Sequence, residues 1–423
     1  MITVRLGGLP ARLNGMSLMK SLRHSSGESS FSFGRGFRFA VLGLVALLTV
    51  GCGAAADQRE AGRHDAGGTE SSGPPSVEFS PEGGATDVSP VGEIGVEAHN
   101  AELTRVNMTN SAGEKVAGSI GEDGNGWTLG ESLGYGKTYE FSVTAKGTDG
   151  RTVTESSRFT TVNPESLTYV SMNPLDGQTV GVGQPLAFYF SEDAPAPNKQ
   201  RAEQAIDIST DPHVEGAFYW FNDREVHWRP ENYWKSDTEI TIDVNVYGKD
   251  LGNGVYGEED RSATVRIGER VVLSADGQSH RMRVEVGGEV KRTIPVSLGK
   301  PSFPSHNGTH VVMRKHESYL MDSSTFGLSM EEGGYRTEVK WAVRISNGGE
   351  FLHGAPWSVG DQGERNVSHG CINMSLSDAK WVYDLVKKGD VVNITNSGGQ
   401  QLSSWDGFGD WQVPWSEWVE GNK

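Results

Sequence analysis

Two histidines and one cysteine near the C-terminal end of the chain have the types and spacing needed for nucleophilic acyl transfer. His353 is followed, after fourteen residues, by Ser368-His369-Gly370-Cys371. A cysteine is strongly nucleophilic only as the thiolate, and a neighbouring imidazole is the usual group that takes the thiol proton. Gly370 lets the backbone approach a substrate closely, so that amide N–H groups can bind an oxyanion. The pattern predicts that Cys371 is a nucleophile and His353 its base.

Two other interpretations use the same residues. A cysteine buried beside two structural histidines would give the same sequence, and a metal site is possible because His353, His369 and Cys371 are all ligand types that zinc binds. The chain has two cysteines, and the other one, Cys52, lies in the N-terminal leader region. A lone thiol in an exported protein has no internal disulfide partner, so it is either buried and inert or reactive. The adjoining glycine and the two histidines favour the reactive thiol.

The motif resembles the signature of the L,D-transpeptidases, the YkuD-type enzymes of the bacterial cell wall. The resemblance continues through His353-Gly354-Ala355-Pro356-Trp357 and Ser368-His369-Gly370-Cys371-Ile372-Asn373. It covers most of the chain after about residue 76 and is strongest to mycobacterial members with two immunoglobulin-like domains. Gly354 is a departure, because those enzymes have a serine at this position.

This resemblance implies a reaction and its partners. Cys371 would attack a tetrapeptide stem of peptidoglycan, release the terminal D-alanine and hold the stem as a thioester. A side-chain amine of a neighbouring stem would then resolve the thioester and form a 3→3 cross-link. No cofactor is implied, and carbapenem β-lactams would be covalent inhibitors. Two alternatives stay open: an L,D-carboxypeptidase, in which water replaces the amine, and a non-catalytic cell-surface binding protein.

The resemblance also implies roles for individual residues. The carbonyl of Gly354 would fix the tautomer of His353, and N–H groups around His369, Gly370 and Cys371 would hold the oxyanion. We expect His369 to be structural rather than a second base. The remaining residues expected to contact substrate or form the wall of its pocket are Tyr335, Gly348, Gly349, Asn373, Trp357, Met321, Phe326 and Ser368.

Residues 1–52 are predicted to be an export leader. The apolar run from Phe39 to Val50 has the length of a signal-peptide hydrophobic region and is short for a membrane span. Its end overlaps Leu47-Leu48-Thr49-Val50-Gly51-Cys52, which resembles a bacterial lipobox. Cys52 is therefore predicted to be lipidated and to anchor the exported protein to the cell membrane, facing the cell wall. Cleavage by an ordinary signal peptidase near residues 54–56 is the alternative. Residues 53–75 are rich in small and polar side chains and are predicted to form a flexible tether.

The remainder of the chain is predicted to be mainly β. Residues 76–163 and 164–268 show a weak internal repeat of alternating strands and turns, which is typical of two immunoglobulin-like sandwiches without a disulfide. Residues 269–397 are predicted to form the catalytic domain, a small β-sandwich or barrel with one short helix. Residues 398–423 would form a tryptophan-rich C-terminal subdomain that packs as a clasp.

Charge and acidic clusters limit the possible partners. The net charge of −17 and the lack of basic runs outside the leader argue against a nucleic-acid partner. Asp250, Asn253 and Gly254 lie on a glycine-rich turn that could hold calcium. We consider this a weak candidate and prefer a solvated acidic turn.

Overall fold

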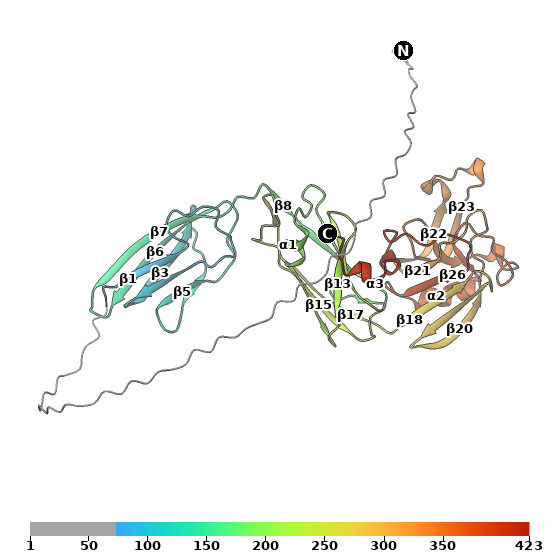
Figure 1. Cartoon of the computed structure of the whole chain (residues 1–423), viewed down its shortest axis with the longest axis horizontal. Coiled ribbons are helices and arrows are strands. Elements are labelled where there is room, and N and C mark those ends of the chain that lie inside the picture. The colour runs from blue at the N-terminus through green and yellow to red at the C-terminus, as the bar shows by residue number, and fades with distance from the viewer. Residues whose placement is uncertain (1–72, 423) are drawn as a thin grey trace, which may run out of the picture. The chain divides into compact units, whose positions relative to one another are not determined.

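The computed structural model of the chain describes residues 73–422 (Figure 1). The predicted leader, the Cys52 lipidation site and most of the predicted tether lie outside these residues. No helix within residues 73–422 is both long and apolar enough to cross a membrane. The expected mainly β architecture is confirmed, because strands dominate and every helix in this range is short.

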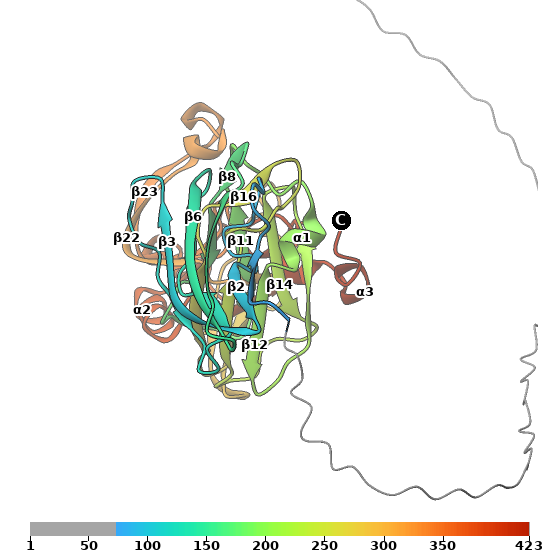
Figure 2. The same cartoon turned by 90° about the vertical axis from the view of Figure 1, so that its left-hand side faces the viewer.

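The first sandwich is built from strands that alternate buried and solvent-facing side chains, the pattern of sheets with one face in a core. In β6, Tyr139, Phe141, Val143 and Ala145 are all buried. One sheet has the order β1 (Ser76–Ser80), β2 (Gly95–His99), β5 (Gly126–Leu129), β4 (Gly118–Ile120). The other has the order β3 (Ala101–Asn110), β6 (Thr138–Gly147), β7 (Thr152–Thr160), and Figure 2 shows β3 beside β6.

The second sandwich follows the same rule, with Ile240, Ile242 and Val244 of β15 buried and the residues between them more exposed. One sheet has the order β10 (Thr179–Val180), β17 (Arg261–Ile267), β15 (Glu239–Val244), β12 (Ile206–Asp211). The other has the order β13 (Gly216–Trp220), β14 (Glu225–Pro230), β11 (Leu186–Phe190), β9 (Val170–Asn173). A short pair, β8 (Ser166–Thr168) and β16 (Val255–Gly257), and the helix α1 (Lys199–Glu203) complete it.

In the glycine-rich turn that was considered for calcium, the carboxylate of Asp250 contacts other groups of the protein. The Asp250 carboxylate forms an ion pair with Arg201 at 2.5 Å and accepts the Gly252 N–H at 2.8 Å. Within residues 73–422, no three His, Cys, Asp or Glu side chains are grouped in a way that could hold a metal ion. Among the described residues, His353, His369 and Cys371 do not form such a group.

The C-terminal half contains two sheets and one longer helix. The five-stranded sheet has the order β20 (Glu289–Pro295), β19 (Arg281–Val286), β18 (Val271–Asp276), β26 (Val391–Thr395), β21 (Gly308–Val311). The four-stranded sheet has the order β22 (Arg314–Asp322), β23 (Arg336–Arg344), β24 (Phe351–Gly354), β25 (Ile372–Met374). The helix α2 (Leu376–Leu385) packs on β23 and β24, and its N-cap Ser375 accepts the Asp378 N–H. The 3₁₀ turns are η1 (Ser323–Phe326), η2 (Met330–Glu332) and η3 (Pro356–Ser358).

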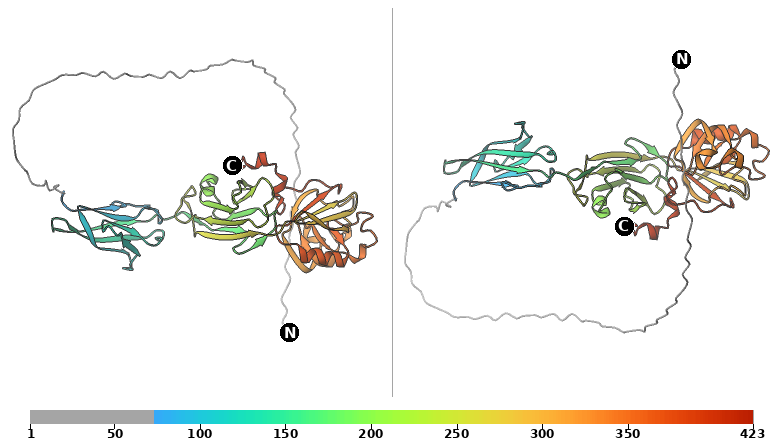
Figure 3. Two further views of the ribbon diagram at one scale, coloured as in Figure 1. Left: turned by 90° about the horizontal axis from the view of Figure 1, so that it is seen from below. Right: turned by 90° about the horizontal axis from the view of Figure 1, so that it is seen from above.

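The tryptophan-rich tail, with η4 (Gly409–Gln412) and α3 (Trp415–Trp418), packs on the second sandwich (Figure 3). The indole N–H groups of Trp411 and Trp418 each donate a 2.8 Å hydrogen bond to a carbonyl of that sandwich. Between these two rings lies the guanidinium of Arg229, 4.6 Å from the centre of Trp411 and 4.2 Å from that of Trp418. Such cation–π contacts stabilise a desolvated arginine. These tryptophans are therefore packing residues, and the tail acts as a clasp.

Candidate active site

Strand register places the predicted base and nucleophile on one face of the four-stranded sheet. β24 and β25 run parallel, with Leu352 opposite Ile372 and His353 opposite Asn373. Side chains of registered residues point to the same face, and so do side chains two positions apart. Leu352 and Ile372 are fully buried in the core. His353, Asn373 and Cys371, which is two residues before Asn373, therefore share the opposite face.

That face forms the wall of a cleft of about 230 Å³ that holds the catalytic candidates. Cys371 is only 4% exposed, yet it lines the cleft together with His353. The cleft is lined by Met321, Tyr335, Thr337, Val339, His353, Trp357, Ser358, Asp361, Val367, Ser368, His369, Cys371 and Asn373. The nucleophile is thus shielded from bulk water but accessible to a substrate that enters the cleft.

Both members of the pair are electrically neutral in the resting site. Burial raises the pKa of the Cys371 thiol to about 12. Burial also lowers the pKa of His353 to about 4, against a smaller opposing effect of its hydrogen bond to Gly354. His353 Nδ1 lies 3.0 Å from the Gly354 carbonyl, which can only accept, so Nδ1 carries the proton and Nε2 keeps its lone pair. The His353 imidazole is therefore a neutral base in the resting enzyme, and Cys371 is a thiol rather than a thiolate.

The backbone around the nucleophile is held by Ser368 and Ser305. Ser368 Oγ accepts the Gly370 N–H at 3.1 Å and donates to the Cys371 carbonyl at 2.6 Å. Gly370 has φ +119°, which only glycine adopts without strain, and its carbonyl accepts a 2.6 Å hydrogen bond from Ser305 Oγ. The Gly370 N–H already donates to Ser368 Oγ and is therefore not available to an oxyanion. The remaining candidate donors among the three expected amides are those of His369 and Cys371.

A neutral resting thiol predicts a steep pH dependence for simple alkylation of Cys371. Iodoacetamide reacts with the thiolate, and well below a pKa of about 12 the thiolate fraction rises tenfold per pH unit. We expect the alkylation rate to rise about tenfold per unit from pH 7 to pH 9, measured by peptide mapping, which separates Cys371 from Cys52. A rate that is already level between pH 6 and pH 8 would mean a preformed thiolate–imidazolium pair and contradict this protonation state.

Comparisons with known proteins identify the family of the chain. Residues 270–394 match the model of the L,D-transpeptidase catalytic domain, and residues 85–250 match that of the bacterial Ig domain. L,D-transpeptidase 2 of Mycobacterium tuberculosis (strain CDC 1551 / Oshkosh) is 45% identical over 340 residues, which are 80% of this chain and 83% of the relative. The chain belongs to the L,D-transpeptidase family.

Other transpeptidases of this family are similar to the chain over about half of its length or more. L,D-transpeptidase 5 of M. tuberculosis (strain ATCC 25618 / H37Rv) is 39% identical over 353 residues, 82% of this chain and 76% of the relative. A solved structure of the LD transpeptidase LdtMt1 in complex with imipenem is 36% identical, with a TM-score of 0.47, and covers 53% of this chain and 97% of its own.

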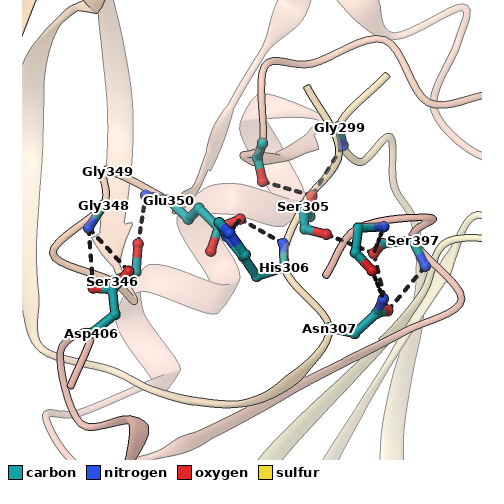
Figure 4. Close-up of polar contacts among 12 residues, drawn as sticks. Gly299, Ser305, His306, Asn307, Ser346, Gly348, Gly349, Glu350, Ser397 and Asp406 are labelled. Atoms are coloured by element: carbon teal, nitrogen blue, oxygen red, sulfur yellow. Dashed lines mark hydrogen bonds and ion pairs between the residues drawn. The ribbon is translucent and has the colours of Figure 1, made fainter. Parts of the chain in front are cut away.

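A buried carboxylate, Glu350, lies beside the segment that carries Ser305 and His306 in the transpeptidase (Figure 4). Glu350, 6% exposed, accepts hydrogen bonds from the His306 N–H at 2.8 Å and from His310 Nε2 at 3.0 Å. Burial alone would raise the pKa of Glu350, but the hydrogen bonds from the two histidines outweigh it and lower the pKa to about 2. Glu350 therefore stays ionised and links the segment that carries Ser305 to the start of β24.

A second carboxylate, Asp406 of the tail, holds the loop before β24 in the transpeptidase. Asp406 is 8% exposed and accepts the N–H groups of Asn347 at 2.5 Å and Gly348 at 3.1 Å, as Figure 4 shows for Gly348. The next residue, Gly349, places its carbonyl 3.8 Å from the Cys371 sulfur. Gly348 and Gly349 are thus fixed backbone beside the nucleophile.

His369 is held in place by contacts that leave it no clear role as a base. Lys300 Nζ lies 2.9 Å from His369 Nε2, so the ammonium donates and the imidazole nitrogen accepts. The ring lies 5.0 Å from the rings of Phe303 and Tyr335. Burial and the charge of Lys300 both lower the pKa of His369. These contacts fit the expected structural role.

The structure places most of the expected substrate residues around the cleft. Met321, Tyr335, Trp357, Ser368 and Asn373 line it, and the amide of Asn373 donates to Ser358 Oγ at 3.2 Å. Trp357 is 59% exposed, with its ring 6.0 Å from that of His353. Phe326 lies in η1, but its side chain is outside the part of the structure that is described.

The residues that support or line the cleft and that sequence reasoning missed include Lys300, Ser305, Glu350, Asp361 and Asp406. Asp361 could have been found, since it lies between His353 and Ser368 in a loop that had to approach both. Asp406 gave no such signal, because it acts on a loop 58 residues earlier in the chain.

Proposed function

We propose that the enzyme is a peptidoglycan L,D-transpeptidase that forms 3→3 cross-links through a Cys371 thioester. The observation that carries this proposal is the cleft in which Cys371, His353 and Asn373 share one sheet face, with Nε2 of His353 free to accept a proton. The family membership supplies the substrate class, a tetrapeptide stem as donor.

The protonation states of Cys371 and His353 determine when the thiol proton is transferred in the first step. Since Cys371 is a thiol and His353 a neutral base, the thiol proton moves to Nε2 as the sulfur attacks the peptide carbonyl, rather than beforehand. The Cys371 and His369 amides are the proposed donors to the developing oxyanion, and one such donor contributes about 3–4 kcal/mol to lowering the barrier. The imidazolium, strongly acidic in this buried site, then protonates the leaving nitrogen of D-alanine.

The second step regenerates the thiol. The incoming amine attacks the thioester carbonyl, the carbon–sulfur bond breaks, and His353 returns a proton to the sulfur. If water attacks instead, the product is a tripeptide, as in an L,D-carboxypeptidase. Carbapenems are proposed inhibitors because their strained amide is an electrophile for the same thiol.

Product analysis with a defined donor tests the proposal directly. The purified enzyme is incubated with a disaccharide-tetrapeptide, and the products are separated by mass. We expect a cross-linked dimer that has lost one D-alanine, with tripeptide as a minor product. Tripeptide alone would assign the carboxypeptidase, and no reaction together with no carbapenem adduct on Cys371 would leave only a binding protein.

We propose further that the enzyme acts outside the cytoplasm, anchored to the cell membrane through a lipidated Cys52. The support is the apolar run of residues 39–50 and the lipobox-like residues that lead into Cys52. The polar composition of residues 53–72 would let the folded part reach the cell wall.

A further inference from the structure

A cluster of one carboxylate and two histidines lies close to the nucleophile but outside the cleft. Glu350 Oε1 lies 3.2 Å from His306 Nδ1, and Oε2 lies 3.0 Å from His310 Nε2. The side chain of Glu350 is 7% exposed and that of His310 is fully buried, whereas that of His306 is 45% exposed. None of the three is among the described residues that line the cleft. The influence of this cluster on the reaction therefore has to pass through other residues.

A short series of hydrogen bonds connects the cluster to Cys371. The His306 N–H donates to Glu350 Oε1 at 2.8 Å (Figure 4). The residue before it, Ser305, donates through Oγ to the Gly370 carbonyl at 2.6 Å, and this carbonyl belongs to the peptide bond that leads into Cys371. A Cβ placed on Gly370 would lie 3.7 Å from Glu350 Oε1, so the carboxylate also lies close to this glycine. Glu350 thus holds the segment that in turn holds the backbone of the nucleophile.

One member of the cluster, His306, changes its charge near neutral pH. The hydrogen bond to Glu350 and the charges of Glu350 and Asp406 raise the pKa of His306, against the opposing effect of burial. The protonated ring forms a charge-assisted hydrogen bond with Glu350, which is stronger than a neutral one. This contribution is present in full below pH 6.5 and is lost as the pH rises through the raised pKa. Between pH 6 and pH 9 the reacting pair itself stays neutral, since the pKa of Cys371 is about 12 and that of His353 about 4.

We propose that Glu350 and His306 are positioning residues that keep Cys371 oriented for attack on the bound carbonyl, and that protonation of His306 strengthens this positioning. The observation that carries the proposal is the series of contacts from the Glu350 carboxylate to the Gly370 carbonyl. The inference rests on the proposed transpeptidase function and deepens it, because it assigns a pH-dependent control to acylation of the same thiol. Acylation that depends on His306 should therefore be faster in mildly acidic than in mildly alkaline medium.

The first experiment compares two electrophiles that differ in how far they need an oriented sulfur. Acylation of the full chain by a carbapenem is followed by intact mass at several concentrations, and alkylation of Cys371 by iodoacetamide is followed by peptide mapping. For Glu350→Gln, which keeps the shape and removes the charge, we expect a maximal acylation rate about tenfold lower and an unchanged half-saturating concentration. Alkylation should instead be about twofold faster, because burial raises the pKa of Cys371 and the charge of Glu350 adds to this effect.

The second experiment tests the pH dependence with a matched control. His306→Asn keeps a neutral donor near the position of Nδ1 but cannot be protonated. His99→Asn is the control, because His99 of the first sandwich is 44% exposed and lies 3.2 Å from the carboxylate of Glu78. The maximal acylation rate of the unmodified enzyme should exceed that of His306→Asn about threefold at pH 6 and equal it at pH 9. His99→Asn should match the unmodified enzyme at every pH.

A double variant shows whether Glu350 acts through Ser305. Ser305→Ala combined with Glu350→Gln should lower the acylation rate by less than the product of the two single losses. The proposal is overturned by independent losses, by an unchanged acylation rate in Glu350→Gln, or by alkylation that falls together with acylation. A constant ratio between the unmodified enzyme and His306→Asn from pH 6 to pH 9 would also overturn it, and this comparison decides even if Glu350→Gln fails to fold. Absence of a carbapenem adduct on the unmodified enzyme would refute the proposed function instead.

Discussion

Replacement of Cys371 by alanine is expected to abolish both the cross-linked dimer and the tripeptide. The thiol forms the covalent bond in both reactions, and loss of a nucleophile that acts together with its base lowers turnover on the order of 10⁴–10⁶-fold. The measurement is product mass after incubation with the disaccharide-tetrapeptide. A variant that still forms either product at more than background would refute Cys371 as the nucleophile.

The fold should survive this change, which makes the loss of activity interpretable. Cys371 packs with Met321, Val339, Ala342 and Phe351 in a small buried cluster. Removing one sulfur atom from such a cluster costs roughly 1–2 kcal/mol, so the melting temperature should fall by only a few degrees. The Glu364→Gln variant is a suitable control, since its side chain is exposed and outside the cleft.

Replacement of Asp410 by alanine is expected to give the largest loss of stability among single changes in the tail. Asp410 Oδ1 lies 2.7 Å from His227 Nδ1, and neither side chain is more than 2% exposed. Breaking a buried ion pair leaves an uncompensated charge, which typically costs roughly 3–5 kcal/mol. We expect a cost of about 3 kcal/mol, because Glu225 still contacts the other ring nitrogen at 3.1 Å. The melting temperature of the second sandwich should fall on the order of 10 °C.

Glu225 provides the matched control, and pH provides a second measurement. Glu225→Gln removes the other, 31% exposed partner of His227 and should cost about 1 kcal/mol. Burial alone would lower the pKa of His227, but the charge of Asp410 and the hydrogen bonds with both carboxylates raise it to about 9. This contribution to stability is present in full below pH 6.5 and is lost as the pH rises through 9. A melting temperature that does not fall between pH 6.5 and pH 9.5, or an Asp410→Ala variant as stable as Glu225→Gln, would contradict the prediction.

The catalytic motif was readable from sequence because its residues lie close together along the chain. Cys371, His369 and Ser368 are adjacent, and His353 is one strand away, so β24 and β25 need only pair in parallel to bring them together. Alternating apolar residues likewise predicted the sandwiches, since a strand with one buried face must repeat every second residue. Asp361 lay within the same window and was overlooked.

The supporting residues could not be predicted in the same way. Glu350 binds His306 and His310, which are 44 and 40 residues earlier in the sequence. Asp406 binds the N–H of Gly348, which is 58 residues earlier. Nothing in the residue types at those positions indicates which loop they will contact. Their partners are set by how β21, β24 and the tail pack in three dimensions.

Taken alone, the sequence determined the family and the mainly β fold and predicted Cys371 as nucleophile and His353 as base, because these follow from local spacing and strand alternation. The tertiary structure decided the protonation of Cys371 and His353, and it showed that the Gly370 N–H is already engaged by Ser368. Those properties depend on desolvation and on hydrogen bonds between segments far apart in the chain. A pKa near 12 on the thiol and near 4 on the imidazole arises from burial that no stretch of sequence specifies.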